Sequence, residues 1–218
     1  MSPVETFPAL TQVPGIIHGF TGRIPDLEVK VEREEALRRL ERAHAELRAE
    51  LGLADHRLII ADQVHGSQVV TVDRTTTVPV PATDGIMTND PQVCLGVYVA
   101  DCGPVFLVDP VKRVGALLHS GRKGTELGIT TVAIRKMVEE FGSAPSDLIV
   151  QLGPCIRSPL YEIDFATEIL RQARAEGVHE VHDCGTCTGT NVDRYYSYRV
   201  EKGRTGRLLA LLAVGVPS

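Results

Sequence analysis

The sequence predicts a mixed α/β domain of the α+β type, because strand-like and helical patterns alternate along the chain. Its 218 residues are enough to bury one sizeable core. No internal repeat, low-complexity tract or Ser/Gly-rich linker marks a boundary. We therefore expect a single domain over residues 1–218.

The clearest helix is predicted between Val29 and Leu53. Leucines recur there at three- and four-residue spacing, while arginine and glutamate cover the other faces. Gly52 suits the end of this helix. His44 falls in the apolar seam, where we expect a histidine that packs in the core. The leucines of the seam are Leu37, Leu40, Leu47 and Leu51.

Apolar runs rich in β-branched residues predict the strands, and two further helices are expected between them. One helix follows the turn at Gly121–Gly124 and presents an apolar face as far as Phe141. The other has Asp164 as its N-cap and ends at Gly177. The predicted strands cover residues 58–60, 68–72, 93–99, 105–108, 113–119, 148–152 and 208–214.

Charge and composition exclude several classes of protein. The formal net charge of −5 gives no basic surface for nucleic acid or an anionic membrane. Aromatic residues make up 5% and Trp is absent, which argues against a base-stacking surface. No apolar run approaches the ~20 residues of a membrane helix, and residues 1–15 lack the pattern of a signal peptide. Five cysteines, an odd number, argue against a disulfide scaffold, so we expect a cytoplasmic protein.

Three metal-binding residue types stand at the ends of predicted strands: His65, Cys102 and His119. Two imidazoles and a thiolate suit Zn²⁺ and leave a fourth position open in a catalytic site. The three residues are far apart in the sequence, so no local metal motif exists. A buried structural cysteine with two hydrogen-bonded histidines is the alternative. A metal-free pair of cysteine nucleophile and histidine base is another.

A second candidate site is the turn that contains Arg122 and Lys123 between Gly121 and Gly124. Glycines allow the backbone to approach a ligand, and the N–H groups at the start of a helix attract anions. Phosphate or another anion could bind there. Neither standard phosphate-loop motif matches, so a polar turn with solvated charges is an equal alternative.

Cys184 and Cys187 form a C-x-x-C pattern directly after His182 and Asp183. The pattern is found in redox pairs and in metal sites. Two reduced loop cysteines are the more common case.

Taken in order, ten short motifs make this sequence resemble the bacterial laccase-domain family. That family is also called multicopper polyphenol oxidase-like and, in later usage, purine nucleoside phosphorylases. The motifs span residues 18–207, nearly the whole chain. They are His18-Gly19-Phe20-Thr21-Gly22-Arg23, Gln63-Val64-His65-Gly66, Thr83-Asp84-Gly85-Ile86-Met87-Thr88, Ala100-Asp101-Cys102-Gly103-Pro104-Val105, His119-Ser120-Gly121-Arg122-Lys123-Gly124-Thr125, Gly153-Pro154-Cys155-Ile156, Tyr161-Glu162-Ile163, Cys187-Thr188, Tyr196-Ser197-Tyr198-Arg199 and Thr205-Gly206-Arg207.

The resemblance implies a layered α/β/β/α sandwich with a metal site of two histidines and one cysteine. Carried over by position, the ligands are His65, Cys102 and His119. It also implies phosphorolysis of adenosine, inosine and methylthioadenosine, and deamination of adenosine. Zinc is the expected metal and copper the less expected one. The expected partners are a purine nucleoside and phosphate, and the oligomeric state stays open.

Three further roles follow from this reading. Asp101 or Glu162 would carry a proton, because zinc deaminases need a carboxylate beside the metal. Arg23 would contact the substrate, and the loop Gly121–Gly124 would bind phosphate.

Two departures from the family pattern touch the expected substrate pocket. The Trp usual in this loop is replaced by Arg122 and the usual Arg by Lys123. A planar guanidinium thus gives way to a point charge at position 123, although Arg122 could supply a guanidinium from the neighbouring position. The usual Gly-Gly turn after Arg23 is missing.

Three alternatives to the purine reading remain. Copper-dependent phenol oxidation is the first alternative. Multicopper oxidases use many more histidines than the seven present in this chain, some of which are already assigned to one metal site. A metal-free hydrolase or amidase that is built on Cys102 and His119 and acts on a cell-wall precursor is the second alternative. A non-catalytic ligand-binding protein is the third.

Overall fold

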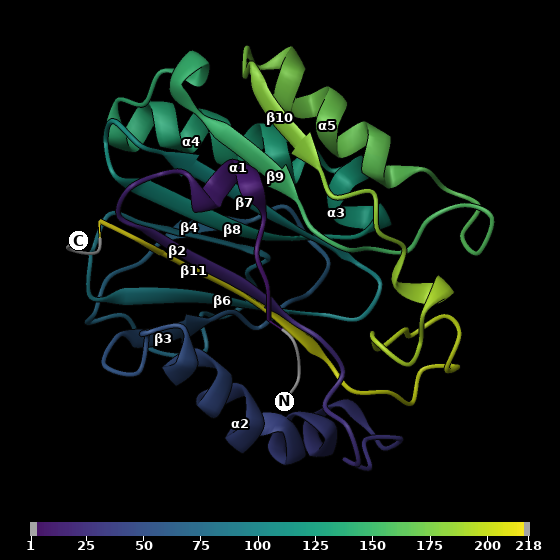
Figure 1. Ribbon diagram of the computed structural model, residues 1–218. Helices are drawn as coiled ribbons and strands as arrows, with labels where there is room; N and C mark the ends of the chain where they lie inside the picture. The colour runs from purple at the N-terminus through teal and green to yellow at the C-terminus, as the bar shows by residue number, and fades with distance from the viewer. Residues whose placement is uncertain (1–3, 216–218) are drawn as a thin grey trace.

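The computed structural model describes residues 4–215, which form two β-sheets packed face to face with helices on both outer surfaces (Figure 1). The layers follow the order helix, sheet, sheet, helix. This arrangement confirms the predicted mixed α/β class and the α/β/β/α sandwich. None of the helices among the described residues is both long and apolar enough to span a membrane.

The first sheet has the strand order β1-β2-β11-β6-β3. Its neighbours are antiparallel except for β3 and β6, which run parallel. The bounds are β1 Val4–Glu5, β2 Ile16–Thr21, β11 Leu208–Val214, β6 Val93–Val99 and β3 Arg57–Ile60.

The second sheet has the order β10-β9-β7-β8-β5-β4 and provides two elements of the candidate site. Its three central pairs are antiparallel, and the two edge pairs are parallel. The bounds are β10 Glu180–Asp183, β9 Ile149–Leu152, β7 Gly103–Asp109, β8 Val114–Ser120, β5 Gly85–Thr88 and β4 Val69–Thr71.

The long helices cover the outer faces of both sheets. Helix α2 (Arg33–Glu50) lies outside the first sheet, and α4 (Ile129–Phe141) and α5 (Phe165–Ala175) lie outside the second (Figure 1). Asp164 caps α5 as predicted, since its carboxylate accepts from the Thr167 N–H at 3.0 Å. The short elements are the helices α1 Pro8–Thr11 and α3 Arg122–Glu126 and the 3₁₀ turns η1 Pro145–Asp147 and η2 Thr188–Thr190.

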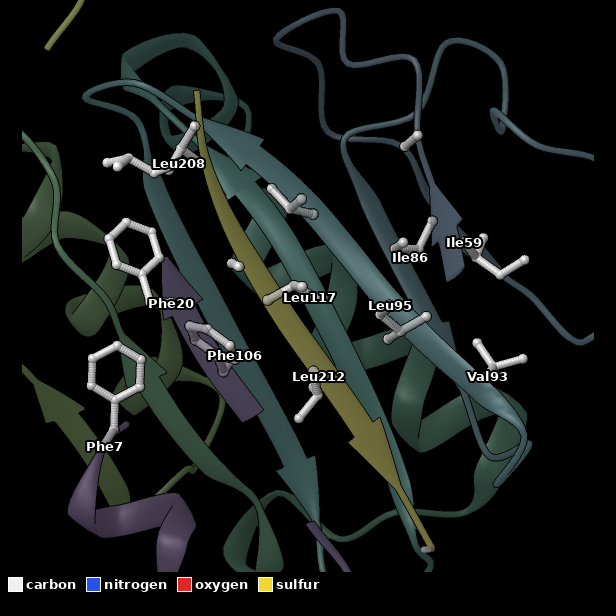
Figure 2. Close-up of a cluster of buried hydrophobic side chains, with 14 of the residues drawn as sticks. Phe7, Phe20, Ile59, Ile86, Val93, Leu95, Phe106, Leu117, Leu208 and Leu212 are labelled. Carbon is white, nitrogen blue, oxygen red and sulfur yellow. The ribbon is translucent and has the colours of Figure 1, made fainter. Parts of the chain in front are cut away.

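The main core lies between the two sheets. Figure 2 shows Phe20 and Leu212 of the first sheet in one cluster with Phe106 and Leu117 of the second. Alternate residues of β7, such as Leu107, face the helices instead. Because the central strands are buried on both faces, they appear in the sequence as continuous apolar runs.

The sequence analysis missed β1, β2, β5, β10 and the short helix α1, and it placed the start of the first long helix too early. Strand β2 contains a histidine and a glycine, which interrupt its apolar pattern. His18 is nevertheless buried there, and its Nε2 accepts from the Phe7 N–H at 2.7 Å. Helix α2 begins at Arg33 because Glu32 is still extended; Val29 is buried but lies outside the helix.

The helix predicted to follow Gly121–Gly124 directly is divided in two. Helix α3 ends at Glu126 and α4 begins at Ile129. Between them Gly128 has a left-handed backbone with φ of 76°, which no continuous α-helix accommodates.

His44 makes the stability of the fold sensitive to acid. Its ring is 3% exposed, lies 5.7 Å from that of Tyr98, and has no hydrogen-bond partner at either nitrogen within residues 4–215. Burial lowers the pKa of His44 to about 4 from an ordinary 6.5. Between these values the unfolded chain binds a proton that the folded chain does not, so stability falls as the pH falls.

Because of this histidine, we expect the free energy of unfolding to fall by about 2 kcal/mol as the pH is lowered from about 8 to 5. His44→Leu should remove that part of the pH dependence, which urea unfolding at both pH values measures. His179→Gln, at an exposed position, serves as the control. An unchanged pH dependence in His44→Leu would show that the ring is solvated when charged.

Candidate metal centre

The fold brings together the three residues that the sequence analysis proposed as metal ligands. His65 lies in the loop between β3 and β4, Cys102 in the turn between β6 and β7, and His119 on β8. One donor atom from each residue lies within 4.8 Å of the other two. Within residues 4–215 no other group of three His, Cys, Asp or Glu side chains has such a geometry.

Local backbone geometry explains how these side chains approach one another. Asp101 adopts φ of 85° and His65 adopts φ of 61°, both in the left-handed region that non-glycine residues rarely enter. At Gly121 an added Cβ would lie 2.5 Å from the Cys102 sulfur. Gly121 therefore leaves room for the thiol, and the two turns with left-handed residues carry His65 and Cys102 to the same place as His119.

Asp84 is a site residue that the sequence analysis did not single out. Its fully buried carboxylate accepts from the backbone N–H groups of Val64, His65 and Gly66 at 3.1, 2.9 and 2.6 Å. It also lies 2.8 Å from Nδ1 of His119. One carboxylate thus fixes the loop of one ligand and the ring of another. Its place beside both was not readable from the sequence, because the pairing of β5 with β8 creates it.

The hydrogen bond to Asp84 also determines which nitrogen of His119 can bind a metal. With Nδ1 directed at the carboxylate, Nε2 remains as the ligand atom. Metal-binding histidines commonly have such a carboxylate partner, which fixes the ring and its tautomer.

The electrostatics of the centre favour a thiolate. Burial would raise the pKa of the Cys102 thiol, but His119 and His65 beside the sulfur outweigh burial and lower the pKa to about 6. Burial would lower the pKa of His119, yet Cys102 and Asp84 raise it to about 9. The sulfur is therefore stabilised in the form that binds metals, by a positive charge that a metal ion can replace.

The two carboxylates proposed for proton transfer have different surroundings. Asp101 accepts from the Thr188 hydroxyl at 2.6 Å, the Ser197 hydroxyl at 3.0 Å and the Arg199 backbone N–H at 2.7 Å. Its carboxylate ties the segment after β10 to the turn that contains Cys102. Glu162 is exposed and lies 3.2 Å from the Arg199 guanidinium.

Arg23, proposed as a substrate contact, is bound to the protein on several sides. It lies 2.8 Å from Glu201, donates to the Tyr195 carbonyl at 3.1 Å and stacks 4.4 Å from the centre of the Tyr196 ring. These contacts stabilise the segment that Asp101 holds from the other side.

The proposed phosphate loop lies beside the metal ligands. Arg122 is exposed and pairs with Glu126 at 2.8 Å, and Lys123 is exposed as well. An added Cβ at Gly124 would lie 3.0 Å from the Gly66 carbonyl. Close contact between the loop and the His65 segment therefore requires glycine at this position.

Comparison with known proteins shows the family of this chain. A family model described as multi-copper polyphenol oxidoreductase laccase matches residues 19–170 and 161–215. The chain belongs to this family. A purine nucleoside phosphorylase of Streptomyces coelicolor is 32% identical, with 76% of this chain and 79% of that protein covered. Purine nucleoside phosphorylase YlmD of Bacillus subtilis is 27% identical, with coverage of 72% and 70%.

Solved structures support the fold of this laccase-family chain. The hypothetical protein YfiH of Bacillus licheniformis superposes with a TM-score of 0.79 at 21% identity, covering 93% of this chain and 94% of that one. YlmD of Geobacillus stearothermophilus gives a TM-score of 0.78 at 24% identity, with coverage of 95% and 94%.

The family name refers to several copper ions, whereas residues 4–215 contain one group suited to a metal. Its two imidazoles and one thiolate fit a metal cofactor.

The C-x-x-C cysteines of this laccase-family chain are not part of that group. Cys184 packs against the core between the sheets, whereas Cys187 packs against the core beneath the helices. Both are free, and the two side chains contribute to different cores.

Proposed function

We propose that this chain is a zinc-dependent purine nucleoside enzyme that acts by phosphorolysis on adenosine, inosine and methylthioadenosine and also deaminates adenosine. The observation that supports this proposal most directly is the group of His65, Cys102 and His119, in which the Asp84 carboxylate lies at hydrogen-bond distance from His119. Relatives named purine nucleoside phosphorylase support the choice of substrate. We further propose one domain over residues 1–218; the cytoplasmic location stays a prediction.

Zinc is proposed because a thiolate and two imidazoles suit it and leave a position open for substrate. Bound there, zinc would supply Lewis-acid polarisation and a nucleophile at neutral pH. The protein's own part is to hold the ligands: Asp84 keeps the proton of His119 on Nδ1 and fixes the loop of His65.

For proton transfer we propose Glu162 as the mobile group and Asp101 as the fixed one. The Glu162 carboxylate is exposed and has one arginine partner, so it can move and exchange protons with solvent. The Asp101 carboxylate already accepts three hydrogen bonds, which hold it in place.

For phosphate we propose the loop Gly121–Gly124, with Arg23 supporting the neighbouring segment. Replacing both Arg122 and Lys123 by glutamate should raise the KM for phosphate roughly ten-fold or more, because charge-assisted contacts of that strength are lost. Steady-state kinetics with varied phosphate measure this effect, and zinc content should stay unchanged. Unaltered dependence on phosphate would leave the loop as a solvated turn.

The arrangement of His119 between Cys102 and Asp84 favours a second candidate function. A thiol with a lowered pKa, a histidine and a buried carboxylate are the parts of a cysteine hydrolase or amidase. Such an enzyme would need no metal.

The test of the proposed function is incubation of the zinc-loaded protein with adenosine. We expect inosine without phosphate, and adenine or hypoxanthine with phosphate. Both products should disappear after treatment with a strong chelator. A thiol hydrolase would instead survive chelation and be inactivated by alkylation of Cys102. A copper oxidase would need oxygen and gain activity with copper. Intact adenosine with a folded, zinc-loaded protein would refute the purine function.

A further inference from the structure

Arg207 stands directly before β11, and part of its guanidinium is engaged by the main chain. Nη1 donates to the carbonyls of Thr205 and Gly206, both at 2.9 Å. Within residues 4–215 neither Nε nor Nη2 makes a hydrogen bond, and both atoms reach solvent. One edge of the fork is therefore available to a ligand.

A chain of hydrogen bonds links the segment before Arg207 to the metal centre: Asp101, the neighbour of Cys102, bonds to Ser197, and Glu201 bonds to both Ser197 and Thr205. The Arg207 guanidinium carbon is 6.0 Å from the centre of the Tyr198 ring. Burial and the nearby Arg33 lower the pKa of Arg207, while Tyr198, Cys102 and Asp101 act in the opposite direction. The charge is thus partly desolvated and within electrostatic reach of the sulfur ligand.

Among residues 4–215, Arg207 has no acidic partner of its own, in contrast to other arginines around the site. Arg23 pairs with Glu201, Arg122 with Glu126 and Arg199 with Glu162. No carboxylate within the described part of the chain lies at ion-pair distance from Arg207. A partly buried charge without a counter-ion is costly, which makes Arg207 a candidate for binding an anion.

The segment around Arg207 is held firmly in place. Glu201 accepts from the Ser197 N–H at 3.1 Å and from the Thr205 hydroxyl at 2.5 Å. Ser197 is in turn bonded to Asp101, the neighbour of Cys102. The position of the guanidinium relative to the metal ligands is therefore fixed before a ligand arrives.

We propose that Arg207 is an anion-binding residue of this site and, in addition to the loop Gly121–Gly124, takes the inorganic phosphate of nucleoside cleavage. The planar fork matches two phosphate oxygens, which a lysine ammonium cannot do. In that reaction a phosphate oxygen forms a bond to C1′ of the ribose. The bond from C1′ to N9 breaks, and the purine leaves with the electron pair and takes up a proton. The choice of phosphate rests on the proposed function.

The experiment compares phosphate binding to the zinc-loaded wild type, Arg207→Met and Arg207→Lys by calorimetry. Arg207→Met should raise the Kd for inorganic phosphate roughly ten-fold or more, and Arg207→Lys should raise it by less. The KM for phosphate should rise in parallel, while zinc content and the Kd for adenosine stay unchanged.

The matched control is Arg48→Met. Arg48 is likewise half-buried and donates to two carbonyls, those of Leu53 and His56, but it lies on α2. It should lose stability without any change in phosphate binding. Should Arg207→Met fail to fold, the lysine variant and its Kd decide the question.

The inference is overturned if the wild type binds no phosphate, or if the phosphate Kd of both Arg207 variants equals that of the wild type. It is separable from the proposed function, because calorimetry with phosphate needs no turnover. Weakened phosphate binding in a protein that leaves adenosine intact would support Arg207 and refute the purine function. Adenosine turnover together with unchanged phosphate binding in the Arg207 variants would support the purine function and refute the role of Arg207.

Discussion

Cys102→Ser should lose most of its zinc, whereas the wild type should hold close to one ion per chain. The serine hydroxyl stays protonated at neutral pH, so the site loses its only anionic ligand of the three. Deleting even an outer partner of a ligand weakens metal binding by about 10- to 100-fold, and a direct ligand should matter more. Metal analysis after dialysis against a chelator measures the effect.

Cys187→Ser is the matched control, because Cys187 is a half-buried free thiol outside the group. It should keep its zinc. Full zinc retention in Cys102→Ser would show that Cys102 is not a ligand.

Asp84→Asn should weaken zinc binding by about 10- to 100-fold although Asp84 is not itself in the metal group. The amide carries no charge, and one of its two ends is a donor that cannot accept from the His119 Nδ1–H or the backbone N–H groups. Two ligands therefore lose their support together. Competition with a chromophoric chelator measures the affinity, and thermal unfolding should show a lower Tm.

Asp62→Asn provides the comparison, since Asp62 is an exposed carboxylate in the same loop as His65. It should bind zinc like the wild type. If Asp84→Asn also bound zinc like the wild type, the carboxylate would serve the fold and not the metal site.

The local pattern of the sequence determined much of this protein. Hydrophobic patterns predicted several elements, because a buried face of a strand or helix requires apolar residues at regular positions in the sequence. These elements are the strands β6, β7, β8, β9 and β11, with their apolar runs, and the amphipathic helix α2. The motif-by-motif resemblance indicated the family and the three ligands. The short strand β5 and the edge strand β10 left no such period, since they take their shape from their neighbours.

Only the tertiary structure decided how charges are paired around the site. Asp84 and His119 are 35 residues apart, and Asp101 and Arg199 are 98 apart, so no spacing rule connects them. Arg23 and Arg207 both follow glycine in the sequence and look equivalent there. Within the part of the chain that the structure describes, the fold gives Arg23 the carboxylate of Glu201 and leaves Arg207 without one. Which cation can bind a ligand depends on which carboxylates the chain brings within reach, and that is a property of packing in three dimensions.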